Sequence, residues 1–360
     1  MAPNSHLNLE SKSIKTKSFW ARRWKMILNI VTVVALGILV YAIRNQLSET
    51  LRNLKHVNLW ILLLIVPIEL LNYHTQTKLY QSLFAVVGNK LSYGFMFRSS
   101  LELNFVNHVF PSGGVSGISY FGLRLKDGQK ITASKATLVQ VMKIVLVVLS
   151  FEVLLVAGLF FLVARGKANP LTMLVTGSLS TLLIFGTLAF SYIIGSKNRI
   201  NSFFTSATKL INKIIHIVRP HHPETINISR ARVAFDDMHE NYIIFRSHYR
   251  QLGWPLFYAL MTSVTELAAL YAVYAAFGEY VNVGAVILAY AVANFAGLIS
   301  VLPGGIGVYE ALMTAVLAAG GVPPSISLPV TVMYRVVNTL IQVPPGYYYY
   351  HKSLRHDGLG

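Results

Sequence analysis

The sequence predicts an all-α, polytopic transmembrane helix bundle. Of its 360 residues, 54% are hydrophobic and only 12% are charged, whereas soluble domains carry about 25% charged residues. The mean hydropathy is +0.53, and long apolar segments follow one another with short polar breaks. These observations favour a single membrane domain over two soluble domains of ordinary size.

The composition also excludes several function classes. The chain has no cysteine, which excludes disulfides, thiolate metal sites and cysteine nucleophiles. It contains no HExxH motif, no spaced acidic metal motif and no serine-centred elbow, so we expect no metal, no cofactor and no enzymatic activity. The formal net charge of +17 does not require a nucleic-acid partner, because membrane proteins gather Lys and Arg on cytoplasmic loops that face anionic lipid.

Membrane helices are expected where an apolar run approaches the 20 or so residues needed to cross the hydrocarbon core. The expected spans are 26–43, 57–80, 137–163, 171–194, 254–277 and 325–343. The first is longer than the apolar core of a signal peptide, about 7–15 residues, so we interpret it as a retained helix. Residues 1–25 form a basic tail, residues 26–350 the membrane domain, and residues 351–360 a short C-terminal tail. The tyrosines at 347–350, behind two prolines, resemble an interfacial aromatic belt.

The distribution of Lys and Arg predicts the orientation of the chain. With the N-terminus inside, the inside segments hold 23 basic residues and the outside loops hold five. Such a bias predicts that both termini are cytoplasmic. The large polar segment 195–252 is then also cytoplasmic. It contains two amphipathic helical patterns, over 200–218 and from about Ser229 onward, which predict either surface helices on anionic lipid or a cytoplasmic hairpin packed on itself and on the bundle.

Two stretches, 95–110 and 283–302, are apolar but end in glycine-rich turns that begin at Pro111 and Pro303. A basic residue follows each proline by 32 positions, within an apolar span, and a polar residue precedes each by nine. The basic residues are Lys143 and Arg335, and the polar residues are Glu102 and Asn294. The shared order of span, broken stretch, turn and basic span predicts an internal repeat, with units at about 57–163 and 254–343.

The predicted orientation makes these repeats inverted in the membrane, because the first unit begins with a span running inward and the second with a span running outward. Inverted repeats with broken helices near the midplane are an architecture of secondary transporters. Non-helical backbone at membrane depth is tolerated only around a protein-buried or water-filled cavity. We therefore expect each repeat to contain a re-entrant broken helix that lines a substrate site.

The motifs at 303–310 (PGGIGVYE) and 111–117 (PSGGVSG) resemble the transmembrane region of lysylphosphatidylglycerol synthases, a wide bacterial and archaeal family called flippase-like. The resemblance covers about residues 26–350. The motif at 111–117 departs from the commoner family pattern, which has an acidic residue where this chain has Ser116 and Gly117. The resemblance implies inverted repeats, a role in moving or handling lipids, and a prokaryotic plasma membrane. In the synthases a soluble aminoacyl-transferase domain follows, and we do not expect that activity here, because this sequence ends about ten residues past the membrane domain.

The candidate site residues fall into three groups. The first comprises turn glycines with backbone N–H groups suited to a phosphate or carboxylate, or to a tight turn alone: Gly113, Gly114, Gly304, Gly305 and Gly307. The second comprises the intramembrane basic residues Lys143 and Arg335, which usually face a partner or a wet cavity, although Lys143 is near enough to the cytoplasmic end to snorkel.

The third group comprises acidic and amide side chains in or beside the membrane segments. They are expected to couple protons, pair with the basic residues, or simply sit near an interface: Glu69, Glu102, Glu152, Glu266, Glu310 and Asn294. Together the three groups predict a flippase-like protein that translocates or handles an anionic or phosphate-bearing lipid or glycolipid. A non-transporting partner of a lipid-directed glycosyl- or aminoacyl-transferase, and an intramembrane enzyme, are the alternatives.

Overall fold

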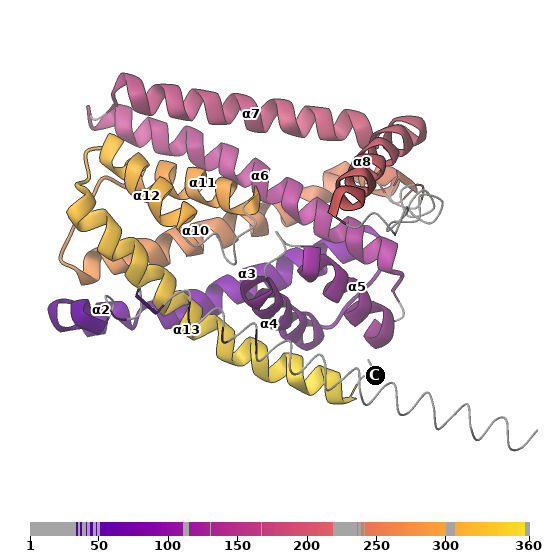
Figure 1. Cartoon of the computed structure of the whole chain (residues 1–360), viewed down its shortest axis with the longest axis horizontal. Coiled ribbons are helices and arrows are strands. Elements are labelled where there is room, and N and C mark those ends of the chain that lie inside the picture. Colours follow the sequence, from indigo (N-terminus) through magenta and orange to yellow (C-terminus); the bar gives the residue numbers. More distant parts are fainter. Residues whose placement is uncertain are drawn as a thin grey trace, which may run out of the picture.

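The computed structural model describes residues 51–110, 115–129, 131–166, 168–218, 242–299 and 307–356, with single residues 34, 37, 41, 44, 45, 48, 236, 239 and 240. All regular structure within these ranges is helical (Figure 1). Five of the described helical stretches are long and apolar enough to cross a membrane: Leu59–Val86, Ala133–Ala164, Pro170–Ile194, Tyr249–Ala276 and Pro324–Leu354. The prediction of an all-α membrane bundle is therefore confirmed.

In chain order, the described elements are η1 (Leu54–His56), α2 (Leu59–Leu62), α3 (Ile65–Val86), α4 (Tyr93–Val109), α5 (Val115–Gln129), α6 (Ala133–Ala164), α7 (Pro170–Ile194), α8 (Lys197–Val218), η2 (Tyr249–Leu252), α10 (Gly253–Ala276), α11 (Val283–Ile299), α12 (Val308–Ala319) and α13 (Pro324–His356). The expected first span, 26–43, lies outside the described residues apart from the single positions given above.

Local sequence signals explain where the long helices begin and end. The Thr132 side chain accepts a hydrogen bond from the Lys135 N–H at the start of α6, and Asn169 forms a capping box before Pro170 at the start of α7. These caps satisfy backbone donors that have no partner within the helix. After α3 and α10 the chain reverses through Gly88 and Gly278, whose φ angles are +81° and +76°, a conformation that glycine adopts without steric cost.

The centre of the bundle is the crossing of α3 and α10, which pack antiparallel along their length. The Asn72 amide donates to the Thr265 hydroxyl at 2.9 Å, while the Thr75 and Thr262 hydroxyls lie 3.0 Å apart. Residue numbers on α10 fall from 265 to 262 as those of their partners on α3 rise from 72 to 75, so the two helices run in opposite directions.

The connections between helices gather at two ends of the bundle. At one end the Asn58 N–H donates to the carbonyl of Ala276 at 2.8 Å, and the Asn169 amide donates to the carbonyl of Ala319 at 2.7 Å. At the other end the Lys135 ammonium donates to the carbonyl of Val87 at 3.3 Å. Hence the start of α4 and the end of α5 lie near one end of the bundle. The start of α11 and the end of α12 lie near the opposite end.

Two halves of the chain share the same helix order, with α3 to α6 in one and α10 to α13 in the other. Shifting α6 by 192 residues, the separation of Pro111 and Pro303, gives 325–356, and α13 occupies 324–356. The packing follows the same exchange, because α4 packs on α13 and α11 packs on α6. Each half therefore supplies the last helix against which the other half's short helix rests.

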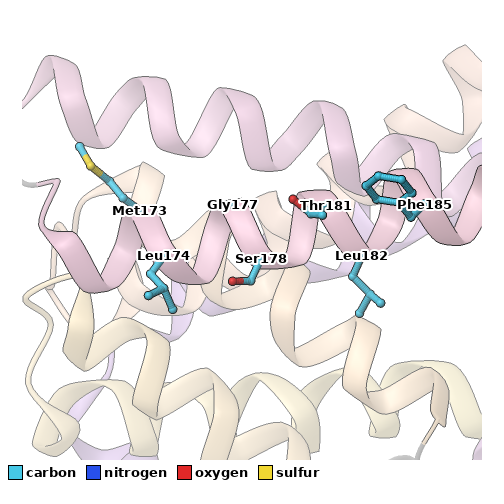
Figure 2. Close-up of a pocket in the computed structure, with 7 residues that line it drawn as sticks. All are labelled: Met173, Leu174, Gly177, Ser178, Thr181, Leu182 and Phe185. Atoms are coloured by element: carbon cyan, nitrogen blue, oxygen red, sulfur yellow. The ribbon is translucent and has the colours of Figure 1, made fainter.

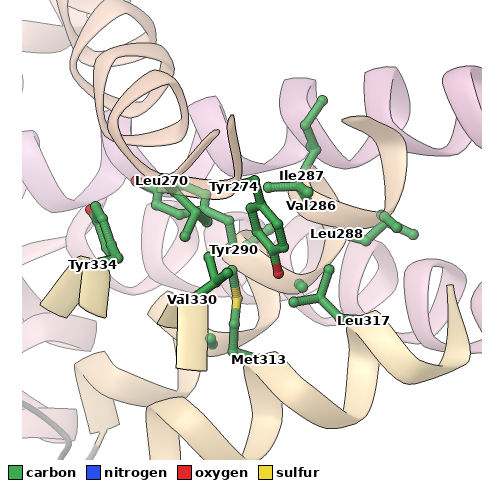
Figure 3. Close-up of a cluster of buried hydrophobic side chains, with 14 of the residues drawn as sticks. Leu270, Tyr274, Val286, Ile287, Leu288, Tyr290, Met313, Leu317, Val330 and Tyr334 are labelled. Atoms are coloured by element: carbon green, nitrogen blue, oxygen red, sulfur yellow. The ribbon is translucent and has the colours of Figure 1, made fainter. Parts of the chain in front are cut away.

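The larger apolar core is centred on the four helices of the second half (Figure 3), and side chains of α2, α3, α6 and α7 also contribute to it. The labelled side chains come from α10, α11, α12 and α13: Leu270, Tyr274, Val286, Ile287, Leu288, Tyr290, Met313, Leu317, Val330 and Tyr334. A second core joins the first half to the start of α8 through residues such as Leu83, Phe121 and Ile200. In a bilayer such contacts act through close packing, because lipid tails are as apolar as the side chains themselves.

The helix α7 lies at one edge of the bundle beside α6 (Figure 1), and only 11% of its most apolar window is buried. The amphipathic pattern at 200–218 is confirmed as a helix by α8. The Asn201 amide donates to the Asp236 carboxylate at 2.6 Å, and the His239 ring lies 2.8 Å from the carbonyl of Ile194. These contacts favour the predicted hairpin packed against the bundle over separate surface helices. The second amphipathic pattern lies only in part within the described residues, where 242–247 are helical.

The last helix is longer than predicted, because α13 continues through Pro344 and Pro345 to His356. The interpretation of the four tyrosines as an interfacial belt was therefore partly wrong. Tyr348 is exposed, but Tyr350 is buried, with its ring 5.2 Å from that of Phe105 on α4. Prolines remove hydrogen bonds from a helix interior, so packing on α4, rather than backbone bonding alone, holds this part of α13 in helical form.

At Gly346 the helix α13 closely approaches α4, and this contact provides a stability test. A methyl group at Gly346 would lie 2.6 Å from both the carbonyl oxygen of Leu101 and the Cβ atom of Phe105. We expect Gly346→Ala to lower the free energy of unfolding by about 1–3 kcal/mol, as overpacking does. Unfolding of the purified protein by SDS in mixed micelles, followed by circular dichroism, measures the change. The control is Gly186→Ala on α7, where nothing lies within 4 Å of the added methyl; equal losses in both variants would contradict the close approach.

Candidate functional site

A buried polar layer occupies the crossing of α3 and α10. The Asn72 amide donates to the Thr262 carbonyl at 3.0 Å and to the Thr265 hydroxyl at 2.9 Å, and its carbonyl oxygen accepts from the Gln76 amide at 2.7 Å. Five polar residues on these two helices are buried here, namely Asn72, Thr75, Gln76, Thr262 and Thr265. Because polar groups in an apolar interior cost several kcal/mol when unpaired, roughly 2–7 each, this layer fixes the register of the two helices.

The predicted intramembrane basic residue on α13 forms an ion pair. The Arg335 guanidinium lies 2.6 Å from the Oε1 atom of Glu310, and the side chains of Arg335 and Glu310 are 17% and 7% exposed. The same guanidinium lies 5.0 Å from the centre of the Tyr309 ring. Arg335 therefore enters the bundle as part of a neutral pair, which removes most of the cost of placing a lone charge in the membrane.

The glutamate of this pair also caps a helix. Its Oε2 atom accepts a 2.7 Å hydrogen bond from the N–H of Gly307, the residue before α12, whose φ is +87°. Gly307 was predicted to donate its N–H to a bound anion, but in the structure this N–H donates to Glu310 of the chain itself. The other predicted turn glycines, Gly113, Gly114, Gly304 and Gly305, lie outside the described residues.

Two further glutamates lie in the layer with no Lys, Arg or His nitrogen at ion-pair distance in the described part of the chain. The Oε2 atom of Glu69 accepts from the Gln342 amide at 3.0 Å, and the Oε2 atom of Glu266 accepts from the Tyr290 hydroxyl at 2.5 Å. Glu69 is 1% exposed. The two carboxylates are close enough for the charge of Glu266 to act on Glu69.

Lys143, the counterpart of Arg335 in the first half, faces the same region. Its ammonium lies 5.0 Å from the centre of the Tyr80 ring, and its charge acts on Glu266. Asn294, the counterpart of Glu102, donates to the carbonyl of Tyr290 at 2.9 Å beside Glu266. The structure thus brings seven of the predicted residues into one region of the interior: Glu69, Lys143, Glu266, Asn294, Gly307, Glu310 and Arg335.

Glu102 does not belong to that region, although it was predicted as a site residue. It is 1% exposed and accepts three hydrogen bonds: from Arg124 at 2.9 Å, from the Tyr120 hydroxyl at 2.8 Å and from the Ser353 hydroxyl at 2.6 Å. These bonds tie the end of α13 to α4 and α5. We conclude that Glu102 has a structural role, because its carboxylate is saturated by donors from the chain itself.

Sequence reasoning missed the neutral partners of this network. The Gln342 side-chain amide donates to Glu69 and, at 2.8 Å, to the side-chain oxygen Oδ1 of Asn338. The Tyr290 hydroxyl donates to Glu266. A signal was present, since Asn338 and Gln342 stand one turn apart and continue the face of Arg335 along α13. Tyr290 had no comparable signal, because a tyrosine in an apolar helix is ordinarily a packing residue.

A hollow of about 890 Å³ lies along α7, apart from the polar region. It is lined by Met173, Leu174, Gly177, Ser178, Thr181, Leu182 and Phe185, which share one stretch of that helix (Figure 2). Leu174 and Phe185 are each more than half exposed. At a rise of 1.5 Å per residue, the lining extends about 18 Å along the helix axis. The hollow is therefore an elongated apolar surface at the edge of the bundle.

These features define a class of protein: an integral membrane helix bundle with a charged, hydrogen-bonded interior built from two matching halves. The chain matches the family of the lysylphosphatidylglycerol synthase transmembrane region over residues 26–346 and belongs to that family. The resemblance inferred from the Pro-Gly-Gly motifs is thereby confirmed.

Archaeal relatives carry the name UPF0104 membrane protein. One from Methanocaldococcus jannaschii is 22% identical over 251 residues, which cover 68% of this chain and 70% of that protein. One from Methanothermobacter thermautotrophicus is 32% identical over 92 residues, and this match spans only 28% of the relative's length and 26% of this chain. These names describe the relatives as membrane proteins and specify no substrate.

The ion pair of Arg335 and Glu310 can be tested by a double-mutant cycle. Replacing either residue alone by leucine leaves the other charge buried, so each change should lower the free energy of unfolding by about 3–5 kcal/mol. The double variant Arg335→Leu/Glu310→Leu leaves no uncompensated charge and should lose much less than the sum of the single variants. Unfolding in mixed micelles provides the measurement, and strictly additive losses would contradict a direct pair.

Proposed function

We propose that this protein translocates an anionic or phosphate-bearing lipid across the membrane. The observation that carries the proposal is the approach of two intramembrane basic residues, Lys143 and Arg335, to one polar interior. They occupy matching helices, α6 and α13. The charge of Lys143 acts on Glu266, and the charge of Arg335 acts on Tyr309 and Tyr334 of the same region. Charges inside a membrane bundle mark substrate or ion pathways far more often than ordinary packing positions.

The architecture supports transport rather than static lipid binding. The helix α3 runs antiparallel to α10, and each half packs its short helix on the last helix of the other half. We infer from this exchange that the halves are inverted repeats, and that the pairs α4–α5 and α11–α12 enter and leave the membrane on one side. In transporters built this way, rocking of one repeat against the other exposes a central site alternately to each face.

The apolar hollow along α7 suits the other end of the substrate. A lipid headgroup can reach a polar interior only if its acyl or isoprenoid chains stay in contact with apolar surface, because each buried CH₂ contributes about 0.8 kcal/mol. The exposed face of α7 between Met173 and Phe185 is such a surface. A headgroup in the bundle and tails along its edge describe an amphiphile, whereas a small water-soluble anion would have no use for the hollow.

Transport can be measured in vesicles of phosphatidylcholine and phosphatidylglycerol that contain the purified protein. Fluorescent phosphatidylglycerol labelled on its acyl chain is bleached by dithionite only in the outer leaflet, so movement between leaflets increases the bleached fraction. We expect the wild-type protein to accelerate movement and Arg335→Gln to abolish it. Arg335→Lys should retain part of the activity, because lysine lacks the planar two-pronged donor geometry. Lys143→Gln should weaken transport less than Arg335→Gln does.

The double variant Arg335→Gln/Glu310→Gln separates binding from folding. It removes both charges together, so its stability should recover relative to Arg335→Gln alone, while transport should remain absent. Recovery of transport in the double variant would make Arg335 purely structural. If neither phosphatidylglycerol nor a polyprenyl-phosphate sugar moves, transport is excluded for these lipids. Chemical change of either lipid during the assay would instead identify a membrane enzyme.

The proposed orientation places both termini in the cytoplasm and the protein in a plasma membrane. Because the sequence has no cysteine, single cysteines can be introduced and labelled on intact cells with an impermeant thiol reagent. We expect labelling at Asn53→Cys and Ala168→Cys, and no labelling at Gln129→Cys, His222→Cys or Asp357→Cys, because basic segments remain inside. Labelling at position 222 from outside would refute both the orientation and the inverted arrangement.

A further inference from the structure

Four of the intramembrane glutamates divide into two kinds. Glu102 and Glu310 are each bound by an arginine, Arg124 and Arg335. Glu69 on α3 and Glu266 on α10 instead accept hydrogen bonds from neutral donors, the Gln342 amide and the Tyr290 hydroxyl, and the charge of Glu266 acts on Glu69. We propose that Glu69 and Glu266 form a proton-binding site, and that a proton bound there accompanies each movement of lipid. The coupling half of this proposal rests on the proposed function, whereas the proton site itself does not.

One carboxylate oxygen of Glu69 has no donor among the described residues. Its Oε2 atom accepts from Gln342, but its Oε1 atom is buried and has no hydrogen-bond partner among the described residues. The Oε1 atom of Gln76 is also buried and without a partner there, and it stands seven residues along α3, on the same helical face. Two unsatisfied acceptors in one apolar interior are costly, and a proton on Glu69 converts one of them into a donor.

Other charged and titratable groups around Glu69 and Glu266 come from most of the helices that pack on α3 and α10. Lys143 of α6 acts on Glu266, and Tyr290 of α11 donates to it. Tyr309 of α12 and Tyr334 of α13 lie within range of Glu266. On the remaining neighbours, the charge of Glu69 acts on Tyr73 of α3, and that of Arg335 acts on His108 of α4. The helix α2 has no titratable side chain, and Tyr249 and Arg250 of η2 are exposed.

A charge count explains why a proton would assist an anionic substrate. With all groups ionised, Lys143 and Arg335 contribute two positive charges, and Glu69, Glu266 and Glu310 contribute three negative charges, so the region carries −1. One proton brings the region to zero, and a second makes it +1. Like charges repel strongly in a medium of low dielectric constant, so protonation of the pair converts an interior that rejects an anionic headgroup into one that accepts it.

A proton fits the pair better than a metal cation does. A cation in a protein site is usually held by several oxygen ligands that converge on one point, about six to eight for calcium. Within the described residues, no group of three or more His, Cys, Asp or Glu side chains is placed to hold a metal ion. A proton needs only one carboxylate oxygen, and Glu69 offers a buried one.

The site can be tested without any transport assay. Dicyclohexylcarbodiimide is an apolar reagent that modifies protonated carboxyl groups, and mass spectrometry of peptides locates the label. With the full-length protein in phosphatidylcholine vesicles, we expect label at Glu69 or Glu266 that declines as the pH is raised, by up to about tenfold per pH unit above the titration midpoint. Arginine-bound Glu102 and Glu310 should stay unlabelled. Absence of label from both Glu69 and Glu266, or labelling independent of pH, would overturn the proton site.

The coupling is tested in the lipid-movement assay with imposed gradients. A pH gradient should accelerate the movement of labelled phosphatidylglycerol by the wild-type protein. In Glu69→Gln and Glu266→Gln, which mimic the protonated form, the rate should be the same with and without the gradient. The control is Glu279→Gln, which removes a carboxylate in the connection between α10 and α11 and should preserve the dependence on pH.

The outcomes separate the two proposals. Lipid movement that ignores the pH gradient, together with absent label, overturns the proton site and leaves the proposed function intact. Label at Glu69 or Glu266 without lipid movement supports the proton site and overturns the proposed function for this lipid. Acceleration by a sodium gradient at equal pH on both sides would overturn the assignment of a proton. If a glutamine variant fails to fold, labelling of the wild-type protein still decides the question.

Discussion

The antiparallel crossing of α3 and α10 is the contact on which the rest of the bundle depends. It places polar groups at the centre of a structure whose surroundings are apolar, and each of those groups must find a partner within the protein. The Asn72 amide meets this requirement by binding two threonines of α10. Sliding either helix by one turn would separate these partners. The crossing therefore fixes the register of the two halves, and with it the positions of Glu69 and Glu266.

From this crossing the two halves extend in matching ways. The helix α4 rests on α13, and α11 rests on α6, so neither half is complete by itself. Glycine makes one of these contacts possible, because Gly346 lets α13 approach the backbone of α4. The bond network around Glu102 strengthens the same contact through Arg124 and Ser353. The second half has no such acidic anchor at the equivalent position, where Asn294 instead binds within its own helix.

This difference between the halves divides the charges into structural and functional sets. Charges that are fully paired within the chain, as in Glu102 with Arg124, contribute to rigidity. Charges that face only neutral donors, as in Glu69 and Glu266, retain the capacity to change state. A transporter requires both kinds, because the repeats must move as rigid units while the centre responds to its ligand. The proton site proposed above uses the second set, whereas the proposed lipid-moving function also uses Lys143 and Arg335, of which Arg335 is paired with Glu310.

The sequence by itself determined the class of the protein and the location of its helices. Hydropathy places the spans because any segment of about 20 apolar residues is most stable as a helix in lipid. The glycine-rich motifs at 111–114 and 303–305 indicated the family and predicted an internal repeat. The sequence also singled out Arg335 and Glu310, since charged residues in apolar runs are conspicuous.

Only the tertiary structure decided which of these charges meet. Arg335 pairs with Glu310, 25 residues away, whereas Glu102 pairs with Arg124 and Ser353, at separations of 22 and 251 residues. Hydropathy and motif spacing contain no information about such distant contacts, which depend on how whole helices cross. For the same reason no sequence pattern indicates that Gln342 binds Glu69 across 273 residues. The extension of α13 beyond Pro345 likewise depends on packing against α4, which outweighs the local preference of proline to end a helix.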